Sequence, residues 1–326
     1  MVGAKATNAL SEHFTVISLR DNKKAVAKFK KGQLISYEEV SDLSKTTGTT
    51  ILFKPDKEIF KEGITLEYEP LRRQLKELAY LSPGMKFILE YPNKEKEIIT
   101  SENGILDYIQ DLNSNKEVIT SIFYAENMEN RIGVKVAMSY NTTYTDTYRL
   151  FTNSIPNSAG THLTGFRTAL TQSINEYAKE KKLLKEKDSN ITGEELKEGL
   201  TLILSFIMPD PVFSGQTKDV LSSSEARTAV QRLVSKEIKV WLENNPKDAK
   251  TIIDKALLAR AAREKAKKAK ETVRKVDAKR RTLLPGKLAD ASSKDRYKCE
   301  IFIVEGKMNC PSSLTVYQRG LYTKKK

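Results

Sequence analysis

The sequence predicts an α+β fold that is divided into about two domains. At roughly 150 residues per domain, 326 residues suffice for two hydrophobic cores. Apolar residues make up 39% of the chain, and they occur both in short β-rich runs and at helical spacing. The composition therefore excludes collagen-like, disulfide-framework and wholly disordered proteins.

The first hundred residues are expected to contain mainly β-strands and one helix. Residues 70–80 carry Leu71, Leu75 and Leu78 at helical spacing, which predicts the helix. The segment 49–53 follows a Thr-Thr-Gly turn and is expected to be a buried strand. The other strands expected in this part are 13–19, 25–29, 85–89 and 97–100, the last two as a hairpin.

A second α+β unit is predicted to follow, beginning with a short helix over 105–112. Three strand-like segments are then spaced as an antiparallel meander, namely 118–124, 132–139 and 145–152. A helix over 163–184 precedes a continuous apolar strand over 199–208. A long helix followed by a buried strand favours a crossover connection.

Two more helices and one strand complete the expected elements. Ser222 and Glu225 form a capping-box pattern at the start of a helix over 222–244. A long, alanine-rich basic helix is expected over 246–279, and a strand of the buried type over 300–304.

The positive charge is confined to the C-terminal part of the chain. The formal net charge is +14, and residues 255–326 hold 21 Lys and Arg against 7 Asp and Glu, so residues 1–254 are neutral. A basic segment on a neutral body suggests that a polyanion is held at one end, and DNA or RNA is the obvious candidate. The alternatives are a solvated helix face and a tail that touches nothing.

The cellular compartment is predicted from the lack of a membrane-spanning run and of a secretory signal in the sequence. No run approaches the ~20 apolar residues of a membrane span, and the first residues have no apolar core of a secretory signal. Two cysteines, Cys299 and Cys310, are typical of reduced cytosolic thiols in a chain of this length. We therefore expect a cytoplasmic protein without membrane association.

The loop between the apolar strand and the capped helix is the first candidate site. It places Gly215, Gln216, Thr217 and Lys218 close together before a helix, an arrangement suited to an anion. Lys218 could neutralise a terminal phosphate, and Gln216 could hydrogen-bond one of its oxygens. Such residues are common in loops, so an ordinary surface loop is the alternative.

Two other positions could carry chemistry. His162, at the start of a helix, is either a structural side chain or a base or switch. Glu305 stands where a strand meets a glycine, from which a carboxylate can reach a metal or a phosphate, although Mg²⁺ chemistry usually needs two or three carboxylates. The histidines and cysteines have no metal-ligand spacing, and no Walker loop, GxGxxG or Ser/His/Asp arrangement occurs.

Taken together, several motifs resemble the B subunits of bacterial DNA gyrase and topoisomerase IV, the type IIA topoisomerases that hydrolyse ATP. The resemblance covers about residues 2–306. The matching motifs, in chain order, are VGAKATNALS, TTGTTILFKPD, IFYAENMENRIGVKVAMSYN, FTNSIPNSAGTHLTGFRTALT, EELKEGL, PDPVFSGQTKDVLSSSEAR, KALLARAAREKAKKAKE, LPGKLAD and FIVEG.

This resemblance implies three domains. Residues 1–103 are similar to the C-terminal half of a GHKL-type ATPase sheet. Residues 104–282 are similar to the transducer domain, which has a ribosomal-protein-S5-like fold and includes the long basic helix. Residues 283–326 are similar to a truncated start of the TOPRIM domain with a divergent tail.

The resemblance also implies site residues. The Gln-Thr-Lys loop of the family reports the γ-phosphate of ATP, which makes Gln216 and Lys218 the strongest candidates. Gly3 matches a phosphate-binding glycine segment, Thr49 a pocket threonine near the adenine, and Arg20 an arginine at the pocket mouth. Glu305 matches the TOPRIM glutamate, a Mg²⁺ ligand or general acid. The basic helix would face DNA with Arg260, Arg263, Lys267, Lys268, Lys270 and Arg274.

The family couples ATP binding and hydrolysis to DNA strand passage and supercoiling. The implied cofactors are ATP and Mg²⁺, and the implied partners are duplex DNA, an A-type subunit with the breakage tyrosine, and a second B subunit in an A2B2 heterotetramer. The glutamate that activates water and the TOPRIM Asp-x-Asp have no match here. We therefore expect a middle fragment that is inactive alone, with a DNA-binding or assembly module, or a truncated non-functional frame, as alternatives.

Overall fold

The computed structural model describes residues 3–281 except 43, 45, 63 and 185–187, together with 301–304 and 320–323. The chain divides into two compact units. The first unit consists of Met1–Glu77 and Lys86–Ile99, and the second of Leu78–Met85 and Thr100–Lys326. The domain boundaries expected from the sequence stay predictions.

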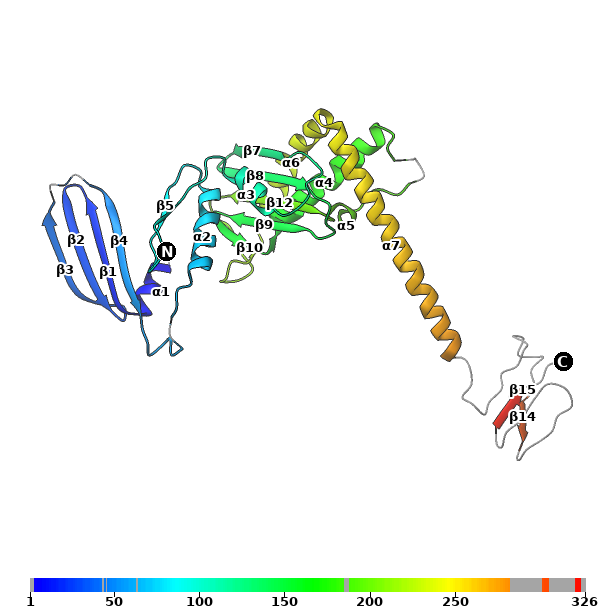
Figure 1. Cartoon of the computed structure of the whole chain (residues 1–326), viewed down its shortest axis with the longest axis horizontal. Coiled ribbons are helices and arrows are strands. Elements are labelled where there is room, and N and C mark those ends of the chain that lie inside the picture. The colour runs from blue at the N-terminus through cyan, green and yellow to red at the C-terminus, as the bar shows by residue number, and fades with distance from the viewer. Residues whose placement is uncertain are drawn as a thin grey trace. The chain divides into compact units, whose positions relative to one another are not determined.

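The first unit contains a four-stranded antiparallel sheet with the order β3-β2-β1-β4 (Figure 1). Asp21 and Asn22 join the first two strands with positive φ angles of 53° and 59°, which suit a tight hairpin turn. A short helix, α1, leads into the sheet. The bounds are α1 Gly3–Ala9, β1 Ser11–Arg20, β2 Lys23–Lys30, β3 Gln33–Ser41 and β4 Gly48–Pro55.

The prediction for 49–53 is correct about the strand and wrong about its burial. The segment is a strand, β4, but it forms an edge of the sheet, and Ile51, Leu52 and Phe53 are 51%, 54% and 52% exposed. An apolar run indicates that a surface can be buried, but only a covering layer buries it. Within the described residues of this unit, no such layer covers these three side chains.

A helix and a hairpin complete the first unit, although the last four residues of this helix, 78–81, belong to the second unit. The predicted helix is α2, Tyr68–Leu81, and the predicted hairpin pairs β5, Phe87–Leu89, with β6, Glu97–Ile99. The Glu97 carboxylate holds the two together, because it accepts hydrogen bonds from Arg72 Nε at 2.9 Å and from the Tyr68 hydroxyl at 2.6 Å. Its pKa is lowered, chiefly by the Tyr68 hydrogen bond.

The second unit is built on a five-stranded sheet with the order β10-β9-β12-β8-β7 (Figure 1). The predicted meander is wrong, because β12 lies between β8 and β9, antiparallel to β8 and parallel to β9. The parallel pair confirms the predicted crossover connection. The strands are β7 Phe123–Glu129, β8 Ile132–Tyr140, β9 Thr147–Thr152, β10 Ile155–Asn157 and β12 Leu200–Ile207.

Helices cover both faces of this sheet. On one face α4, Thr161–Glu180, and α6, Ser224–Asn244, pack against the β12 side chains Leu202, Leu204 and Phe206 in the main core. On the other face α3, Ile105–Leu112, packs with the last turn of α2 against Ile203 and its neighbours. The strand β12 is therefore buried on both faces, which explains why six of its eight residues are apolar.

The other described elements are a long helix and several short segments. The predicted long helix is α7, Pro246–Arg281, and the predicted strand near 300 is β14, Ile301–Val304, which pairs with β15, Gly320–Thr323. Seven of the described elements were not predicted from the sequence. Three of them are α5 Gly193–Leu196, β11 Ala159–Gly160 and β13 Val220–Leu221, and the other four are α1, β3, β10 and β15. None of the described helices is long and apolar enough to cross a membrane.

The predicted capping box at α6 does not form. The N-cap of α6 is Ser223, whose hydroxyl accepts a hydrogen bond from the backbone amide of Val212 at 2.9 Å instead of one from its own helix. Ser222 is hydrogen-bonded to the Ser214 hydroxyl at 2.9 Å. Both serines thus fasten the preceding loop to the start of α6 rather than capping the helix.

Replacing Phe206, a fully buried side chain of β12, tests this layered core. Phe206→Ala is expected to lower the free energy of unfolding by about 3–5 kcal/mol, because it removes buried apolar surface and leaves a cavity. Val240→Ala on the exposed side of α6 is the control and is expected to cost less than ~0.5 kcal/mol. Equal shifts of the denaturation midpoint would show that β12 is not at the centre of the core.

Candidate functional site

The loop that carries Gln216 and Lys218 is fixed at its base. Where β12 ends, the Asn153 side chain donates to Met208 O at 2.8 Å and accepts from the Met208 amide at 3.0 Å. The Ser214 amide then donates to Val220 O at 3.0 Å, and Phe213 forms a β-bridge with Leu221. These contacts hold both sides of the loop at its base, and residues 214–219 at its tip are exposed.

The tip of the loop presents Lys218 on a constrained backbone. Lys218 has a positive φ of 60°, and its amide donates to Gly215 O at 3.1 Å to close a turn. From β10, the Asn157 side chain donates to Lys218 O at 2.8 Å. The backbone of Lys218 is therefore held from both sides, in a conformation that non-glycine residues adopt rarely.

The side chains of Gln216 and Lys218 are both exposed. Lys218 Nζ lies 5.9 Å from the centroid of the Phe213 ring, a cation–π distance. Among the residues that the structure describes, no carboxylate forms an ion pair with this amine. A held backbone with an uncompensated amine and a neighbouring amide can receive an anion. The role of the two residues at a phosphate stays a prediction.

In the first unit, the register of the sheet places Thr49 and Arg20 on one face. Thr49 lies opposite Ser18, and Arg20 follows two residues after Ser18 on β1, so all three side chains project to the same side. The same register adds apolar side chains to this face, among them Phe14, Val16, Ala27, Phe29, Ile51 and Phe53. Arg20 Nε also lies 3.4 Å from Asp21.

Gly3 is placed differently from Thr49 and Arg20. It is the first residue of α1, which leads into the opposite end of β1 from Arg20. The helix packs there, since a Cβ atom added at Gly32 in the β2–β3 turn would meet Ala9 at 3.3 Å. The structure thus gathers Thr49 and Arg20 on one face and leaves Gly3 at the far end of the sheet.

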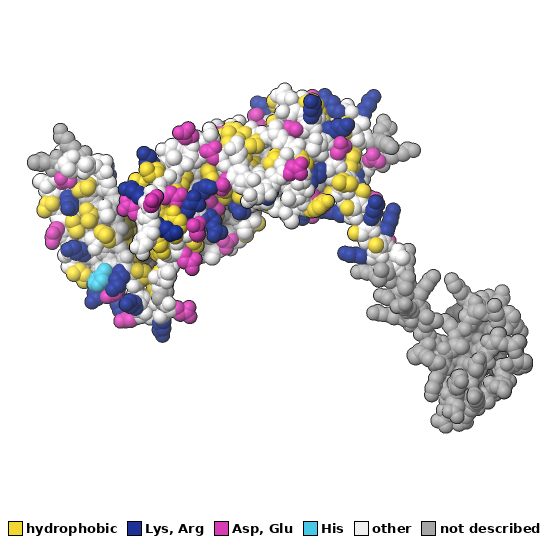
Figure 2. Space-filling model, in the orientation of Figure 1, with side chains coloured by type: hydrophobic (Ala, Val, Ile, Leu, Met, Phe, Trp, Pro, Cys, Tyr) yellow, Lys and Arg dark blue, Asp and Glu magenta, His cyan; other side chains and the backbone are white. Residues whose placement is uncertain are grey.

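The DNA-facing residues predicted on α7 are three lysines, which are exposed, and arginines, two of which contact the domain. Lys267, Lys268 and Lys270 are exposed on a stretch, 261–272, in which every side chain is exposed; Figure 2 shows Lys and Arg side chains where α7 leaves the domain. The side chain of Arg274 lies outside those described, and Glu305 lies outside the described residues.

The contacts of Arg260 and Arg263 differ from the prediction. Arg260 pairs with Glu195 at 2.9 Å and its side chain is only 15% exposed, so its guanidinium is already committed inside the domain. Arg263 is more exposed but donates to Glu194 O at 2.7 Å. The arginines thus hold α7 to the domain, and the lysines beyond them carry the free positive charge.

No metal centre is visible in the described part of the chain. No three His, Cys, Asp or Glu side chains cluster among the described residues. His162, the predicted base or switch, is fully buried, and neither ring nitrogen has a hydrogen-bond partner. Because solvent and substrate do not reach this side chain, we interpret His162 as a structural residue and not as a base.

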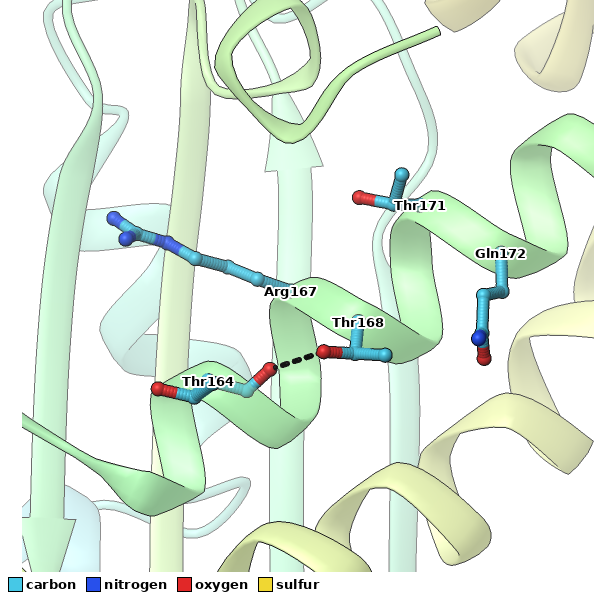
Figure 3. Close-up of a pocket in the computed structure, with 5 residues that line it drawn as sticks. All are labelled: Thr164, Arg167, Thr168, Thr171 and Gln172. Carbon is cyan, nitrogen blue, oxygen red and sulfur yellow. Dashed lines mark hydrogen bonds between the residues drawn. The ribbon is translucent and has the colours of Figure 1, made fainter. Parts of the chain in front are cut away.

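A shallow groove on α4 is a feature that was not predicted from the sequence. It has a volume of about 360 Å³ and is lined by Thr164, Arg167, Thr168, Thr171 and Gln172 (Figure 3). Thr168 donates to Thr164 O at 2.9 Å, and the Arg167 guanidinium lies 5.2 Å from the centroid of the Tyr148 ring. The spacing of these residues places them on one helix face, which is the signal that could have found the groove. All five come from a single helix, so nothing closes the groove around a ligand.

The burial of His162 predicts that the stability of the domain falls in acid. Burial lowers its pKa to about 4. Between about pH 6.5 and pH 4 the unfolded chain binds a proton that the folded chain does not, so stability falls as the pH drops through this window, by on the order of 3 kcal/mol in all. His162→Phe should remove this part of the pH dependence in denaturant titrations at pH 7 and pH 4.5. Parallel pH profiles of the parent and the variant would contradict the assignment.

Comparisons with known proteins agree with the motifs. The family model of DNA gyrase B matches residues 104–272. The DNA gyrase B protein of Clostridium acetobutylicum is 43% identical over 310 residues, which are 94% of this chain and 48% of the relative. The gyrase B protein of Bacillus mycoides is 42% identical over 309 residues, 94% of this chain and 76% of the relative. The chain thus spans about half the length of several curated relatives that it matches.

A solved structure shows the same fold. The 43K ATPase domain of Thermus thermophilus gyrase B, in complex with an aminocoumarin, has a TM-score of 0.68 and 33% sequence identity over 83% of this chain and 74% of that domain. The likeness confirms the predicted α+β class and the resemblance to the ATPase and transducer region. With a family match over half of its residues and relatives above 40% identity, the chain belongs to the DNA gyrase B family.

Proposed function

We propose that this chain forms the part of an ATP-dependent type IIA DNA topoisomerase that detects the γ-phosphate of ATP and passes the signal to a DNA-facing helix. The observation that carries the proposal is Lys218, an exposed amine on a backbone held by Asn157 and by the Gly215 turn. An amine positioned in this way can stabilise charge on a terminal phosphate without reorganising.

Each unit, taken by itself, offers side chains that fit one part of a nucleotide. In the second unit, Lys218 and Gln216 offer a cation and an amide donor to phosphate oxygens. In the first unit, the apolar face of the sheet offers a surface to a base beside the Thr49 hydroxyl and the Arg20 guanidinium. When bound, ATP supplies the terminal phosphate whose charge Lys218 would compensate. Mg²⁺ is part of the proposal only because the family resemblance implies it, and Glu305 is its proposed ligand.

The lysines of α7 support duplex DNA as the second ligand. Lys267, Lys268 and Lys270 are exposed and have no described carboxylate partner. Such a row binds phosphates by releasing counterions, and it positions DNA without reading its sequence. An A-type subunit with the breakage tyrosine and a second B subunit are the partners that strand passage and supercoiling would require.

A second candidate function is a DNA-binding or assembly module without turnover. It is favoured by the same exposed lysines, which are available without any nucleotide. The two candidates differ in ATP turnover, since both predict salt-dependent binding of duplex DNA whether or not Lys218 is intact, but only the first predicts ATP hydrolysis. ATP hydrolysis that DNA stimulates would argue for the first candidate.

Lys218→Ala in the complete subunit with its A-type partner tests the proposed phosphate contact. ATP-driven supercoiling is expected to fall about 10²-fold or more, because one preorganised charge contact to the reacting phosphate is lost. DNA binding without nucleotide should stay unchanged. Lys236→Ala, which removes another exposed lysine, on α6, is the control. Unchanged DNA-stimulated ATPase and supercoiling in Lys218→Ala would contradict the proposal.

The DNA contact can be tested on the chain itself. Changing Lys267, Lys268 and Lys270 together to alanine is expected to reduce the slope of log K against log salt by about 2–3 for random-sequence duplex DNA, since each phosphate contact contributes about 0.9.

The matched control removes the same charge elsewhere, by changing the exposed Lys179, Lys236 and Lys250 to alanine. This control should alter the slope little, because those lysines lie on α4, on α6 and at the start of α7. An equal loss of slope in the two triple variants would mean that binding follows net charge and that α7 has no special part in it.

A further inference from the structure

The helix α7 needs something to fix its direction, because much of it stands clear of the domain. Its first turns contribute buried side chains to the main core, among them Ile252, Ile253 and Ala256, whereas every side chain from 261 to 272 is exposed. The last residues that touch the domain therefore determine where the exposed lysines lie.

Arg260 makes the most extensive of these contacts. Its guanidinium donates from Nε to Glu195 Oε1 at 3.0 Å and from a terminal nitrogen to Glu195 Oε2 at 2.9 Å. It also donates to the backbone oxygens of Ser189 at 3.0 Å and Asn190 at 2.8 Å. A forked pair of this kind fixes orientation as well as distance. With side chains 15% and 10% exposed, the pair is well shielded from water.

Glu195 ties this contact to the neighbouring elements. It forms a capping box with Thr192 at the start of α5, accepting a hydrogen bond from the Thr192 amide at 2.8 Å. Burial raises the pKa of Glu195, but hydrogen bonds from Arg260 and Thr192 outweigh burial and lower it overall. The carboxylate is thus ionised, and α5 and α7 share one buried charge pair.

Lys255 makes a second contact, with a different loop. Its Nζ donates to Thr143 O at 3.1 Å, and burial lowers its pKa. Gly199, with a φ of +74°, lies beside this contact: a Cβ atom there would lie 2.5 Å from Asn141 O and 2.7 Å from both Thr143 O and Lys255 Cε, so the two backbone oxygens require glycine. Lys255 and Arg260 are separated by about 7.5 Å along the helix and by about 140° around it. Two contacts on different sides restrain the tilt of a helix, which one contact does not.

Both contacts lie at the start of β12. Gly199 directly precedes β12, Glu195 lies one turn earlier in α5, and Thr143 follows β8, the strand paired with β12. The other end of β12 leads to the loop of Gln216 and Lys218. One rigid strand therefore has the candidate phosphate contact beyond one end and the attachment of α7 at the other.

We propose that Lys255 and Arg260 are positioning residues that fix the direction of α7 and transmit to it the displacements of β12. The two residues with their partners Thr143, Glu195, Ser189 and Asn190 are here called the α7 clamp. The transmission step rests on the proposed function, whereas the fixed direction does not.

A distance measurement between two spin labels tests the clamp on the chain as it exists. Labels at Thr164→Cys on α4 and Lys268→Cys on α7, with Cys299→Ser and Cys310→Ser, should give one narrow distance distribution. Arg260→Met is expected to broaden it about twofold or more, because the forked contact is lost. Lys255→Met should broaden it as well, and Arg260→Lys should restore part of the narrow distribution.

Arg232→Met is the matched control, because Arg232 pairs with Glu129 at 2.7 Å through side chains that are 63% and 42% exposed. It should leave the distribution unchanged. If Arg260→Met does not fold, Arg260→Lys and Lys255→Met decide the test. Unchanged widths in the folded clamp variants would overturn the proposal.

Activity measurements separate the two parts of the proposal, which are the fixed direction of α7 and the transmission of β12 displacements to it. In the complete subunit, Arg260→Met is expected to keep ATP hydrolysis and to lose most strand passage per ATP consumed. Broad distances with fully coupled strand passage would refute transmission while leaving the clamp. Unchanged ATPase and supercoiling in Lys218→Ala would refute the proposed function and leave the distance result standing.

Discussion

The burial of β12 on both faces is the constraint on which the second unit depends. Leu202, Leu204 and Phe206 enter the core beneath α4 and α6, while Ile203 enters the core beneath α3. Because β12 also pairs with β8 on one side and with β9 on the other, it cannot move without disturbing two cores and two ladders. A strand fixed in this way displaces as a unit, which makes it a suitable link between its two ends.

The functional proposals occupy those two ends. Beyond one end, Asn153 and Ser223 hold the base of a loop whose exposed tip carries Lys218. At the other end, Glu195 joins α5 to Arg260 on α7. The two ends differ in whether the positive side chain has a carboxylate partner. The amine of Lys218 has no described carboxylate partner, whereas the guanidinium of Arg260 is fully paired, which suits the positioning role proposed for it.

The sequence was informative wherever a local pattern decides the structure. The apolar run of β12, the helical spacing of α4 and the basic composition of α7 predicted those elements, because each expresses a period or a burial that one segment can satisfy. It failed where distant partners decide. The insertion of β12 between β8 and β9, the exposure of β4 and the pairing of Arg260 with Glu195, 65 residues away, depend on what the rest of the chain supplies. Lys218 was found as a loop residue, but its held backbone depends on Asn157 in another strand.

Hydrogen exchange of the complete subunit, with and without a non-hydrolysable ATP analogue, tests the central claim most directly. If β12 links the Lys218 loop to α7, the analogue should protect the loop at 213–221 and also change exchange at 255–263, while the β12 amides remain the slowest in both states. Protection confined to the loop, or β12 amides that exchange as fast as those of the exposed stretch of α7, would contradict the account.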